Sequence, residues 1–408
     1  MRCALIKLDR EKYRFVWSHH HILMDGWCNG ILLQEVLAIY KGLERGENLY
    51  LEPTQPYRNY IAWLQEQEIN KAYEYWQSTL SGFIEPTSFS TSTKKDRNNI
   101  TKDITVSLSP EITEQLATFS AEHILTLNTI IQGAWALLLS RYCDRTDVLF
   151  GATVSGRPAD LIGVESIVGL FINTLPVRVK LNPEQELVDW LQKIQQQQIN
   201  REEYSYSSLV DIQKWSDVSS EQALFDSLVI FENYPISLEE FLQNSDTEFI
   251  ISDLDGFEKT NYPLTLYIIP GEKLTLKFSY DTNYFTSEEI EKISDRLTLI
   301  LTNFIESPDR QLANISIISK PELNKFCNNG NRINYPQDLL LPQLFESIVS
   351  NAREKTALIT DRESLTYSEL NERVNKLARH LRSQGVCKGE SRVGIYLERD
   401  ESIPLIID

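Results

Sequence analysis

The first 43 residues switch from a strand-like to a helix-like pattern of apolar positions. Residues 2–8 and 13–19 have the β-branched and aromatic composition of two strands, and the polar residues 9–12 form a turn between them. From about residue 29 to residue 43, apolar side chains recur at helical spacing. The pattern predicts two strands followed by an amphipathic helix.

Further along, helix and strand patterns alternate. Ser109 and Pro110 are typical of a helix N-cap and first helical residue. Residues 128–142 are apolar on nearly all sides, which predicts a buried core helix, and residues 148–154 form an apolar strand pattern. Because helix and strand patterns follow one another, we expect a layered α/β (α+β) fold.

Two changes in composition divide the chain. Residues 85–101 are rich in Ser, Thr, Lys and Asn, and residues 328–331 read Asn-Asn-Gly-Asn, a turn-rich sequence. Beyond this second stretch come a helix pattern, a short strand and a long amphipathic helix. We therefore expect five segments: residues 1–84, a linker at 85–102, residues 103–318, a second linker at 319–340, and residues 341–408.

Composition and charge limit the classes of partner. The 408 residues include 40 basic and 58 acidic ones, giving a net charge of −18, which argues against a nucleic-acid or anionic-membrane surface. Hydrophobic residues make up 42% of the chain, enough to bury sizeable cores. We expect proteins or small molecules as partners, with no nucleic acid and no membrane among them.

Cysteine use and the N-terminal sequence indicate the compartment. The chain has five scattered cysteines, an odd number, which is typical of reduced structural thiols. Charged residues interrupt the short apolar run at the N-terminus, so a signal peptide is not expected, and no stretch reaches the ~18 apolar residues of a membrane span. We expect a cytoplasmic protein.

The most unusual sequence is a run of three histidines, His19 to His21, followed by Asp25 and Gly26. If the preceding strand continues through the run, His19 and His21 share one face of it. A single histidine near a strand end is more often a packed or solvated residue than a catalyst, but three before Asp-Gly-Trp are less ordinary. A zinc site at His19 and His21 would need a third ligand, which the sequence does not offer nearby, so no metal is expected.

Residues 20–26, His-His-Ile-Leu-Met-Asp-Gly, match the His-His-x-x-x-Asp-Gly motif of the condensation domains of nonribosomal peptide synthetases. Other acyltransferases of the chloramphenicol acetyltransferase type share this motif. Further segments resemble the condensation family in order along the chain, namely Tyr57-x-x-Tyr60-x-x-Trp63, residues 154–158 (Val-Ser-Gly-Arg-Pro), residues 168–178 and residues 231–235 (Phe-Glu-Asn-Tyr-Pro). From the residues alone, the three aromatics at Tyr57, Tyr60 and Trp63 lie on one helix face, where packing is the expected role.

The resemblance implies a fold of two chloramphenicol-acetyltransferase-like lobes with a channel between them. Residues 1–84 are then a partial N-terminal lobe and residues 103–318 the C-terminal lobe. Only 19 residues precede the His-His motif, fewer than in the family, so we expect an N-terminally truncated fragment of a larger synthetase with an incomplete first lobe. Residues 365–370 resemble the opening motif of an adenylation domain, whose phosphate-binding loop is absent from this sequence, so adenylation by this chain alone is not expected.

The family likeness also implies a reaction. Condensation domains join an aminoacyl or peptidyl thioester to an acceptor amine, and both substrates arrive on phosphopantetheine arms of donor and acceptor peptidyl carrier proteins. The chain itself is expected to bind no cofactor, and other synthetase modules are its expected partners. The Asp25-Gly26-Trp27 sequence resembles the subtype that joins L-configured residues.

The resemblance assigns catalytic roles to residues of the motif. His21 is expected to accept a proton from the attacking amine or to position it, and His20, Asp25 and Gly26 complete the catalytic set. Gly26 is expected to allow a tight backbone turn near the thioester. These expectations are carried over from the family by the matching positions.

Residues of the second lobe are expected to support this motif or to line the channel. Asp25 is expected to form an ion pair with an arginine, with Arg178 as the preferred partner and Arg157 as the second. Asn173 and Asn233 are expected to line the channel. Removing one partner of such a buried pair would cost ~3–5 kcal/mol.

Two alternatives to amide formation stay open from the sequence. One is a related enzyme, an epimerase or an ester-forming acyltransferase. The other is an inactive remnant or an interaction module in which the fold is retained and the chemistry is not.

Overall fold

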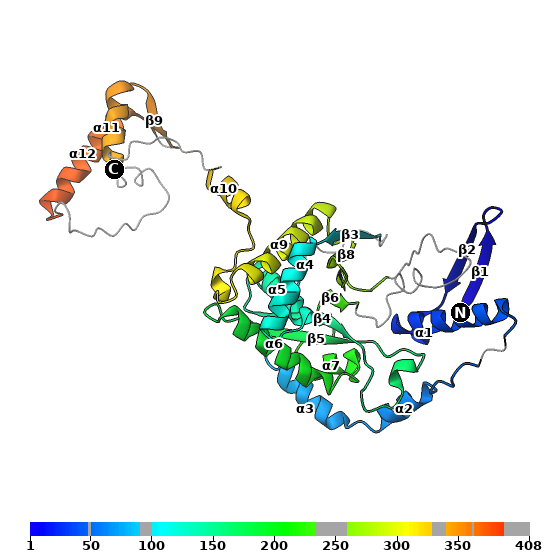
Figure 1. Cartoon of the computed structure of the whole chain (residues 1–408). Coiled ribbons are helices and arrows are strands. Elements are labelled where there is room, and N and C mark those ends of the chain that lie inside the picture. Colours follow the sequence, from blue (N-terminus) through cyan, green and yellow to red (C-terminus); the bar gives the residue numbers. More distant parts are fainter. Residues whose placement is uncertain (48–49, 90–99, 233–258, 329–339, 361–362, 387–408) are drawn as a thin grey trace. The chain divides into compact units, whose positions relative to one another are not determined.

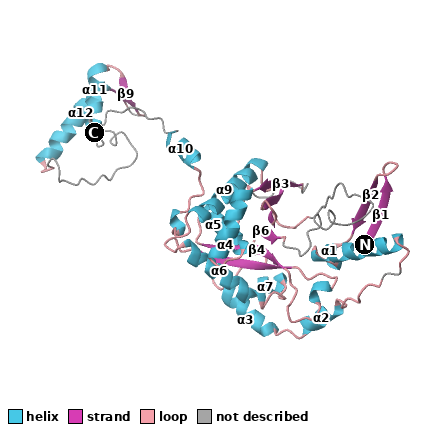
Figure 2. Ribbon diagram, viewed as in Figure 1, coloured by secondary structure: helices cyan, strands magenta, loops and turns pink. Residues whose placement is uncertain are grey.

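A computed structural model describes residues 1–47, 50–89, 100–232, 259–328, 340–360 and 363–386. The chain forms two compact units, Met1–Leu323 and Asn324–Asp408, and each is described here by itself. Most elements of the two units are labelled in Figure 1, and Figure 2 colours them by type.

The larger unit is built on a mixed six-stranded sheet with the strand order β3-β8-β7-β6-β4-β5. Strand β6 runs parallel to β4 and β7, and the other neighbours are antiparallel. The expected strand at 148–154 is confirmed as β4, and the layered α/β prediction is confirmed with it. The bounds are β3 Thr101–Ser107, β4 Asp147–Val154, β5 Asn173–Lys180, β6 Ser227–Phe231, β7 Leu264–Ile269 and β8 Thr275–Asp281.

The main core lies between one face of this sheet and four helices, α4 (Pro110–Glu122), α5 (Leu127–Cys143), α6 (Leu187–Glu202) and α9 (Ser287–Glu306). Helix α5 is buried on nearly all sides, as its apolar sequence predicts. Helix α4 begins as predicted, because Ser109 Oγ accepts a hydrogen bond from the backbone N–H of Ile112 and Pro110 occupies the first turn.

The opposite face of the sheet is covered by α3 (Ile69–Leu80) and α7 (Leu209–Trp215). Along β4, Val148 and Phe150 contribute to the main core, whereas Leu149 between them belongs to the cluster with α3 and α7. This alternation is the two-residue period of a strand. In Figure 1, α4, α5 and α9 lie on one side of β4 and β5, and α3 and α7 on the other. Helix α3 belongs to residues 1–84, the segment expected to form the first lobe, yet it packs on this sheet.

The N-terminal part contains an antiparallel hairpin of β1 (Arg2–Lys7) and β2 (Tyr13–Ser18), followed by α1 (Trp27–Glu44) and α2 (Arg58–Gln65). The two predicted strands and the predicted helix are confirmed. The placement of the histidines on a strand is wrong, because β2 ends at Ser18 and residues His21–Leu23 form a 3₁₀ turn, η1. His19 and His21 therefore do not share a strand face.

The two expected linkers are partly structured. Residues 85–89 lie against the sheet, where Thr87 is buried and its hydroxyl accepts a hydrogen bond from the backbone N–H of Leu149. Helix α10 (Lys320–Asn328) occupies the start of the second linker. Residues 90–99 and 329–339 lie outside the described part of the chain, and the five-segment division stays a prediction.

The smaller unit contains the three elements that the sequence predicts. Helix α11 (Leu341–Asn351) is followed by an antiparallel pair, β9 (Thr356–Ile359) and β10 (Ser364–Thr366), and by α12 (Tyr367–Ser383). Thr366 and Glu369 form a capping box at the start of α12. Leu365, Leu370 and Val374 form its small core.

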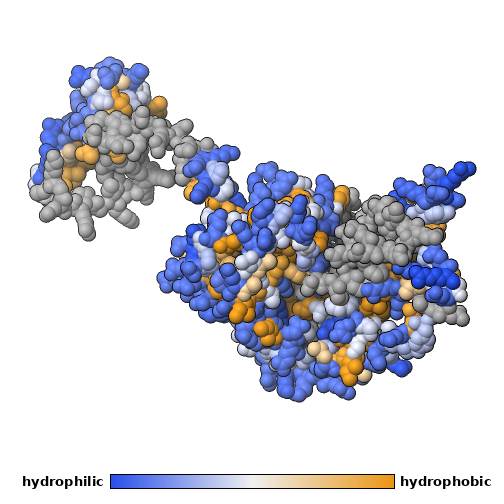
Figure 3. All heavy atoms as spheres, in the orientation of Figure 1, coloured by the Kyte–Doolittle hydropathy of each residue, from blue (hydrophilic) through white to orange (hydrophobic). Residues whose placement is uncertain are grey.

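The visible surface of the larger unit is mostly hydrophilic, with scattered hydrophobic patches (Figure 3). No single helix among the described residues combines the length and apolarity needed to cross a membrane. Helices α4 and α5 meet these criteria only as a pair, and the chain bends by 104° between them.

Candidate functional site

The three histidines of the turn differ in their contacts among the described residues. His20 Nδ1 accepts a hydrogen bond of 3.1 Å from the backbone N–H of Ile22, which caps the 3₁₀ turn. The ring of His19 packs at a tilt against Trp17, with 5.3 Å between ring centroids. The side chain of His21 is exposed. The turn therefore fixes His20 and presents His21 to the surroundings.

Asp25 anchors this turn to the larger sheet's loops. Its carboxylate is fully buried, and Oδ2 accepts hydrogen bonds from the backbone N–H groups of Phe171 (2.8 Å) and Ile172 (3.1 Å). The backbone N–H of Asp25 donates to the carbonyl of Gly169 at 3.4 Å. Residues far apart in the sequence are thus held together by three hydrogen bonds to one aspartate.

Arg157 is the charged partner of Asp25. Arg157 Nη2 lies 3.6 Å from Asp25 Oδ1, and its side chain is only 4% exposed. Nη1 donates to the carbonyls of Ile167 (3.0 Å) and Val164, and the guanidinium lies 4.1 Å from the centre of the Phe171 ring. The second of the two arginines considered from the sequence therefore lies at Asp25.

The preferred partner, Arg178, is elsewhere, and this expectation is corrected. Arg178 Nη2 lies 2.6 Å from Asp147 Oδ2, and Nη1 donates to the carbonyls of Thr79 (2.9 Å) and Ser81 (2.7 Å). Arg178 stands on β5 opposite Leu149 of β4, so Asp147 lies two residues along the same face of the neighbouring strand. The arginine binds this nearby carboxylate and the C-terminal end of α3.

Cys28 is part of the same cluster, and sequence reasoning missed it. Its buried Sγ lies 3.3 Å from Asp25 Oδ1 and 3.2 Å from the carbonyl of Gly169, and accepts a contact from Arg157 Nη2 at 3.6 Å. Burial raises the pKa of the thiol, and Asp25 adds to the effect. Its spacing of three residues from Asp25, at the start of a predicted helix, is the signal that could have placed it beside the carboxylate.

The expected need for a glycine at position 26 is not met, and two other glycines of the site have the close contacts that exclude a side chain. Gly26 has φ −60° and ψ −28°, a right-handed conformation open to any residue, so a special turn at Gly26 is not present. Gly156 has φ +62°, and a Cβ there would lie 1.9 Å from the carbonyl oxygen of Phe171. A Cβ on Gly169 would lie 2.0 Å from the Tyr57 ring. These two glycines permit the close approach that places Arg157 and Phe171 beside Asp25.

The three aromatics on α2 and its N-cap pack as predicted. The Tyr60 ring lies 4.4 Å from the Phe171 ring and is stacked on Trp63, with 5.9 Å between centroids. Tyr57 donates to the carbonyl of Leu170 at 2.5 Å. Burial raises the pKa of Tyr60 to about 12, so its hydroxyl is neutral at physiological pH. The aromatic face holds the loop that binds Asp25.

Asn173 is engaged by the backbone. Its Nδ2 donates to the carbonyls of Ser205 (2.8 Å) and Ser207 (2.7 Å), and its Oδ1 accepts from the N–H of Thr174. Both amide ends are used, which ties the start of β5 to the segment after α6. Asn233 lies outside the described residues.

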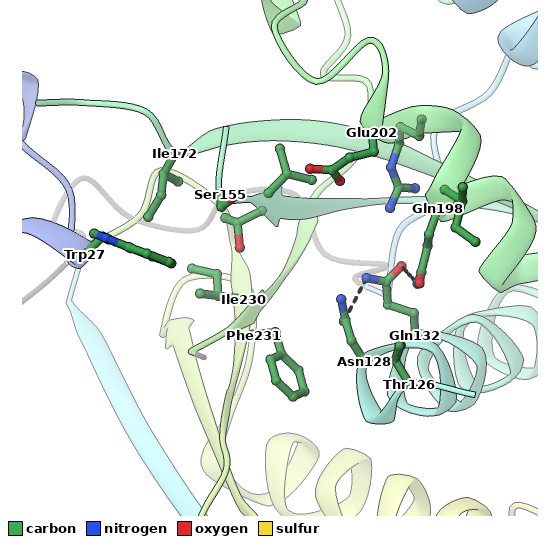
Figure 4. Close-up of a pocket in the computed structure, with 14 residues that line it drawn as sticks. Trp27, Thr126, Asn128, Gln132, Ser155, Ile172, Gln198, Glu202, Ile230 and Phe231 are labelled. Atoms are coloured by element: carbon green, nitrogen blue, oxygen red, sulfur yellow. Dashed lines mark hydrogen bonds between the residues drawn. The ribbon is translucent and has the colours of Figure 1, made fainter. Parts of the chain in front are cut away.

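A cavity of about 580 Å³ lies next to this cluster. Trp27 and Ile172 line it, and they adjoin Gly26 and the carboxylate of Asp25 respectively. The cavity extends to the N-terminal end of α5 and the C-terminal end of α6, as Figure 4 shows. Across the described ranges of the chain, no three His, Cys, Asp or Glu side chains are grouped as a metal would require.

The arrangement suits positioning of a reactive group. A buried ion pair and three backbone hydrogen bonds fix the residues after the histidines, while His21 stays accessible to a substrate. An accessible imidazole on a fixed turn can accept a proton from a bound reactant or deliver one to it. The neighbouring cavity can hold an organic group of small-molecule size.

Comparison with known families gives two matches along the chain. The family model of the condensation domain matches residues 1–326, and that of the AMP-binding enzymes matches residues 345–406. Among curated relatives, a linear gramicidin synthase polypeptide of Brevibacillus parabrevis is 42% identical over 405 residues, which cover 98% of this chain and 5% of that protein. The chain therefore spans only a small part of the length of this relative.

Solved structures share the fold at low sequence identity. The first condensation domain of the calcium-dependent antibiotic synthetase, in complex with a substrate analogue, has a TM-score of 0.60 at 14% identity, covering 78% of this chain and 70% of that one. The X-domain from teicoplanin biosynthesis, in its complex with OxyB, has a TM-score of 0.63 at 19% identity, covering 78% of this chain and 73% of that one. The predicted chloramphenicol-acetyltransferase-like fold class is thereby confirmed.

Proposed function

Because the chain belongs to the condensation domain family of nonribosomal peptide synthetases, we propose that it forms amide bonds between carrier-bound thioesters as part of a larger synthetase. The observation that carries the proposal is the fully buried carboxylate of Asp25, which fixes the motif's turn and leaves His21 exposed. Donor and acceptor peptidyl carrier proteins present the substrates on phosphopantetheine arms. The segment matching AMP-binding enzymes connects the chain to the rest of its module.

The reaction requires one bond to form and one to break. The acceptor's amine nitrogen attacks the donor's thioester carbonyl, a C–N bond forms, the C–S bond breaks, and the donor's pantetheine thiolate leaves. In the proposal, the imidazole of His21 accepts the proton that the nitrogen loses and returns it to the departing thiolate. No covalent link to the enzyme is needed.

The other motif residues are assigned to positioning. His20 uses Nδ1 to cap its own turn, so it is assigned to holding His21 in place. Asp25 and Arg157 hold the turn against the loop at residues 169–172, and Gly26 joins Asp25 to α1. Asn173 shapes the start of β5 beside the cavity. Asn233 is retained as a channel residue from the family likeness alone.

The test is His21→Ala in the full-length synthetase polypeptide that contains this chain. Loss of a proton-transferring imidazole is expected to lower amide formation by about 10²–10⁴-fold while unfolding is unchanged, because the side chain is exposed. His19→Ala is the matched control, since the ring of His19 packs on Trp17 and its loss is expected to leave turnover within a few-fold. Unchanged turnover in His21→Ala would remove the catalytic assignment.

A second candidate is an interaction module without chemistry. It is favoured by the fold shared with the teicoplanin X-domain, whose structure is a complex with OxyB. In that case His21→Ala would leave product formation unaffected, whereas surface substitutions would abolish complex formation.

A related epimerase or ester-forming enzyme would be recognised by its product with amine and hydroxyl acceptors. A cytoplasmic location is proposed from the scattered cysteines.

A further inference from the structure

The cavity beside the motif has a polar end and an apolar end, and the proposed reaction at His21 does not involve the side chains of the polar end. Trp27 stands at one end of it, and Gln132, Gln198 and Glu202 at the other (Figure 4). Apolar side chains occupy the space between, namely Val154, Ile172, Ile230 and Phe231. Its volume of about 580 Å³ is that of a site for a small organic group.

Arg201, on the last turn of α6, lines the polar end and is only 6% exposed. Within the described part of the chain, its guanidinium forms no hydrogen bond and no ion pair. Burial lowers the pKa of this group, Tyr75 and Glu202 act in the opposite direction, and the arginine stays charged. Neighbouring Glu202 is exposed and interacts with Arg201 electrostatically, and no ion pair between the two is formed among the described residues. A buried cation that forms no hydrogen bond and no ion pair among the described residues carries a desolvation cost that a bound anion would offset.

The amides beside Arg201 are linked to one another by hydrogen bonds. Thr129 Oγ1 donates to Gln198 Oε1 (2.8 Å), Gln198 Nε2 donates to Gln132 Oε1 (2.9 Å), and Gln132 Nε2 donates to Asn128 Oδ1 (2.9 Å). The dashed lines in Figure 4 mark the two amide–amide bonds. Each of these amide oxygens accepts one bond, and Nε2 of Gln198 and of Gln132 each donates one, so the second N–H of each nitrogen remains available to a ligand.

We propose that this cavity binds a carboxylate carried by the acyl group of a thioester substrate, with Arg201 as the residue that selects for it. The guanidinium is planar and can bind a carboxylate through two parallel hydrogen bonds. The substrate's reacting carbonyl is part of the thioester and uncharged, so the carboxylate belongs to a side chain such as that of aspartate or glutamate. The apolar walls accommodate the stem of that side chain.

The inference rests on the proposed function for the thioester, but its test does not need amide formation. The whole 408-residue chain is titrated by calorimetry with N-acetyl-aspartyl-pantetheine and with N-acetyl-asparaginyl-pantetheine. These probes differ by one charge at nearly constant size. The expected result is that the aspartyl probe binds at least ~10-fold more tightly, which corresponds to about 1.4 kcal/mol.

Two variants test whether Arg201 causes the tighter binding of the aspartyl probe. Arg201→Gln removes the cation and is expected to bring the two affinities within ~2-fold of one another. Gln198→Glu keeps Arg201 and places a carboxylate three residues away on the same helix, so it is expected to occupy the guanidinium and abolish the preference. Glu203→Gln is the control, since it alters an exposed charge outside the cavity lining and leaves Arg201 in place; its preference is expected to equal that of the natural chain.

Other results would overturn the proposal. Equal binding of the two probes by the natural chain would do so even where Arg201→Gln fails to fold. A preference retained in both Arg201→Gln and Gln198→Glu would show that another group selects the carboxylate. Phosphopantetheine and pantetheine are titrated as well, because an Arg201-dependent gain from the phosphate alone would assign the arginine to the arm's phosphodiester instead. Loss of amide formation with the binding preference intact would count against the proposed function only.

Discussion

Asp25 Oδ1 lies 3.6 Å from Arg157 Nη2, and the two side chains are among the least exposed charged groups of the described chain. The carboxylate also accepts two backbone hydrogen bonds, whereas Arg157 Nε has no partner among the residues that the structure describes. The pair is therefore satisfied more completely on the acidic side. Arg157 is therefore the more informative residue to substitute, because its loss leaves the buried carboxylate of Asp25 without a counter-ion.

Replacing Arg157 by Met leaves the buried carboxylate of Asp25 without its counter-ion. We expect a loss of about 3–5 kcal/mol in the free energy of unfolding of the larger unit. Urea unfolding followed by tryptophan fluorescence reports on this unit, because all seven tryptophans lie in residues 1–323. Arg145→Ala is the control, since its pair with Glu85 is exposed and should be worth less than about 1 kcal/mol. Equal effects of the two variants would contradict the role of burial.

Gly156→Ala is expected to destabilise the loop that holds Arg157. The residue has φ +62°, and the new Cβ would meet the Phe171 carbonyl at 1.9 Å, so backbone strain and a steric clash add to about 2–5 kcal/mol. Gly82→Ala shares the backbone strain at φ +74° but has no atom within 4 Å, and should cost only about 1–2 kcal/mol. Urea midpoints of the two variants measure the difference, and a smaller loss at Gly156 would rule out the clash.

Arg178 is expected to hold the end of α3 on the sheet. Arg178→Ala removes its ion pair with Asp147 and its hydrogen bonds to the carbonyls of Thr79 and Ser81, at a cost of about 2–4 kcal/mol. Amide hydrogen exchange over residues 69–80 should accelerate more than exchange in α9. Lys277→Ala, which breaks a more exposed pair with Asp103, serves as the comparison and should leave α3 unchanged. Unaltered exchange in α3 would refute the anchoring role of Arg178.

Asp226 makes part of the stability depend on pH. Burial raises its pKa from 3.8 to about 6, against the effect of a hydrogen bond from Ser88. The pKa of Asp226 is higher in the folded than in the unfolded chain, so its protonated form favours folding. The contribution of protonated Asp226 to the free energy of unfolding is complete below about pH 4 and is lost as the pH rises through about 6. Asp226→Asn should therefore be more stable than the natural chain at pH 7, by roughly 2–3 kcal/mol. Unfolding curves measured from pH 4 to pH 8 test this, and parallel curves for the two proteins would disprove it.

The elements set by local pattern could be predicted from the sequence. Helix α5 is apolar on nearly all sides and α4 carries both a cap and a first-turn proline, so neither depends on distant residues for its recognition. The end of β2 at Ser18 could not be foreseen, because three histidines carry no breaking signal. Helix α10 lies in a stretch that its polar composition marks as a linker.

The candidate site was predictable as a motif but not as a set of contacts. The family likeness indicates Asp25 and an arginine, yet the choice between Arg157 and Arg178 depends on which strand face each occupies. Strand pairing sets Arg178 beside Asp147, and a left-handed glycine before Arg157 turns that side chain toward Asp25. Cys28 and Arg201 carry no motif at all, and their positions follow only from the packing of α1 and α6.

The hydrogen bonds from Phe171 and Ile172 to Asp25 bear on the construction of hybrid synthetases. A chimera joined within residues 90–99 would take the histidine turn from one parent and the groups that hold it from the other. Such a hybrid should work only when the incoming parent supplies an arginine at position 157 and glycines at positions 156 and 169. Crossover points placed before residue 20 or after residue 180 keep this cluster within one parent and avoid that constraint.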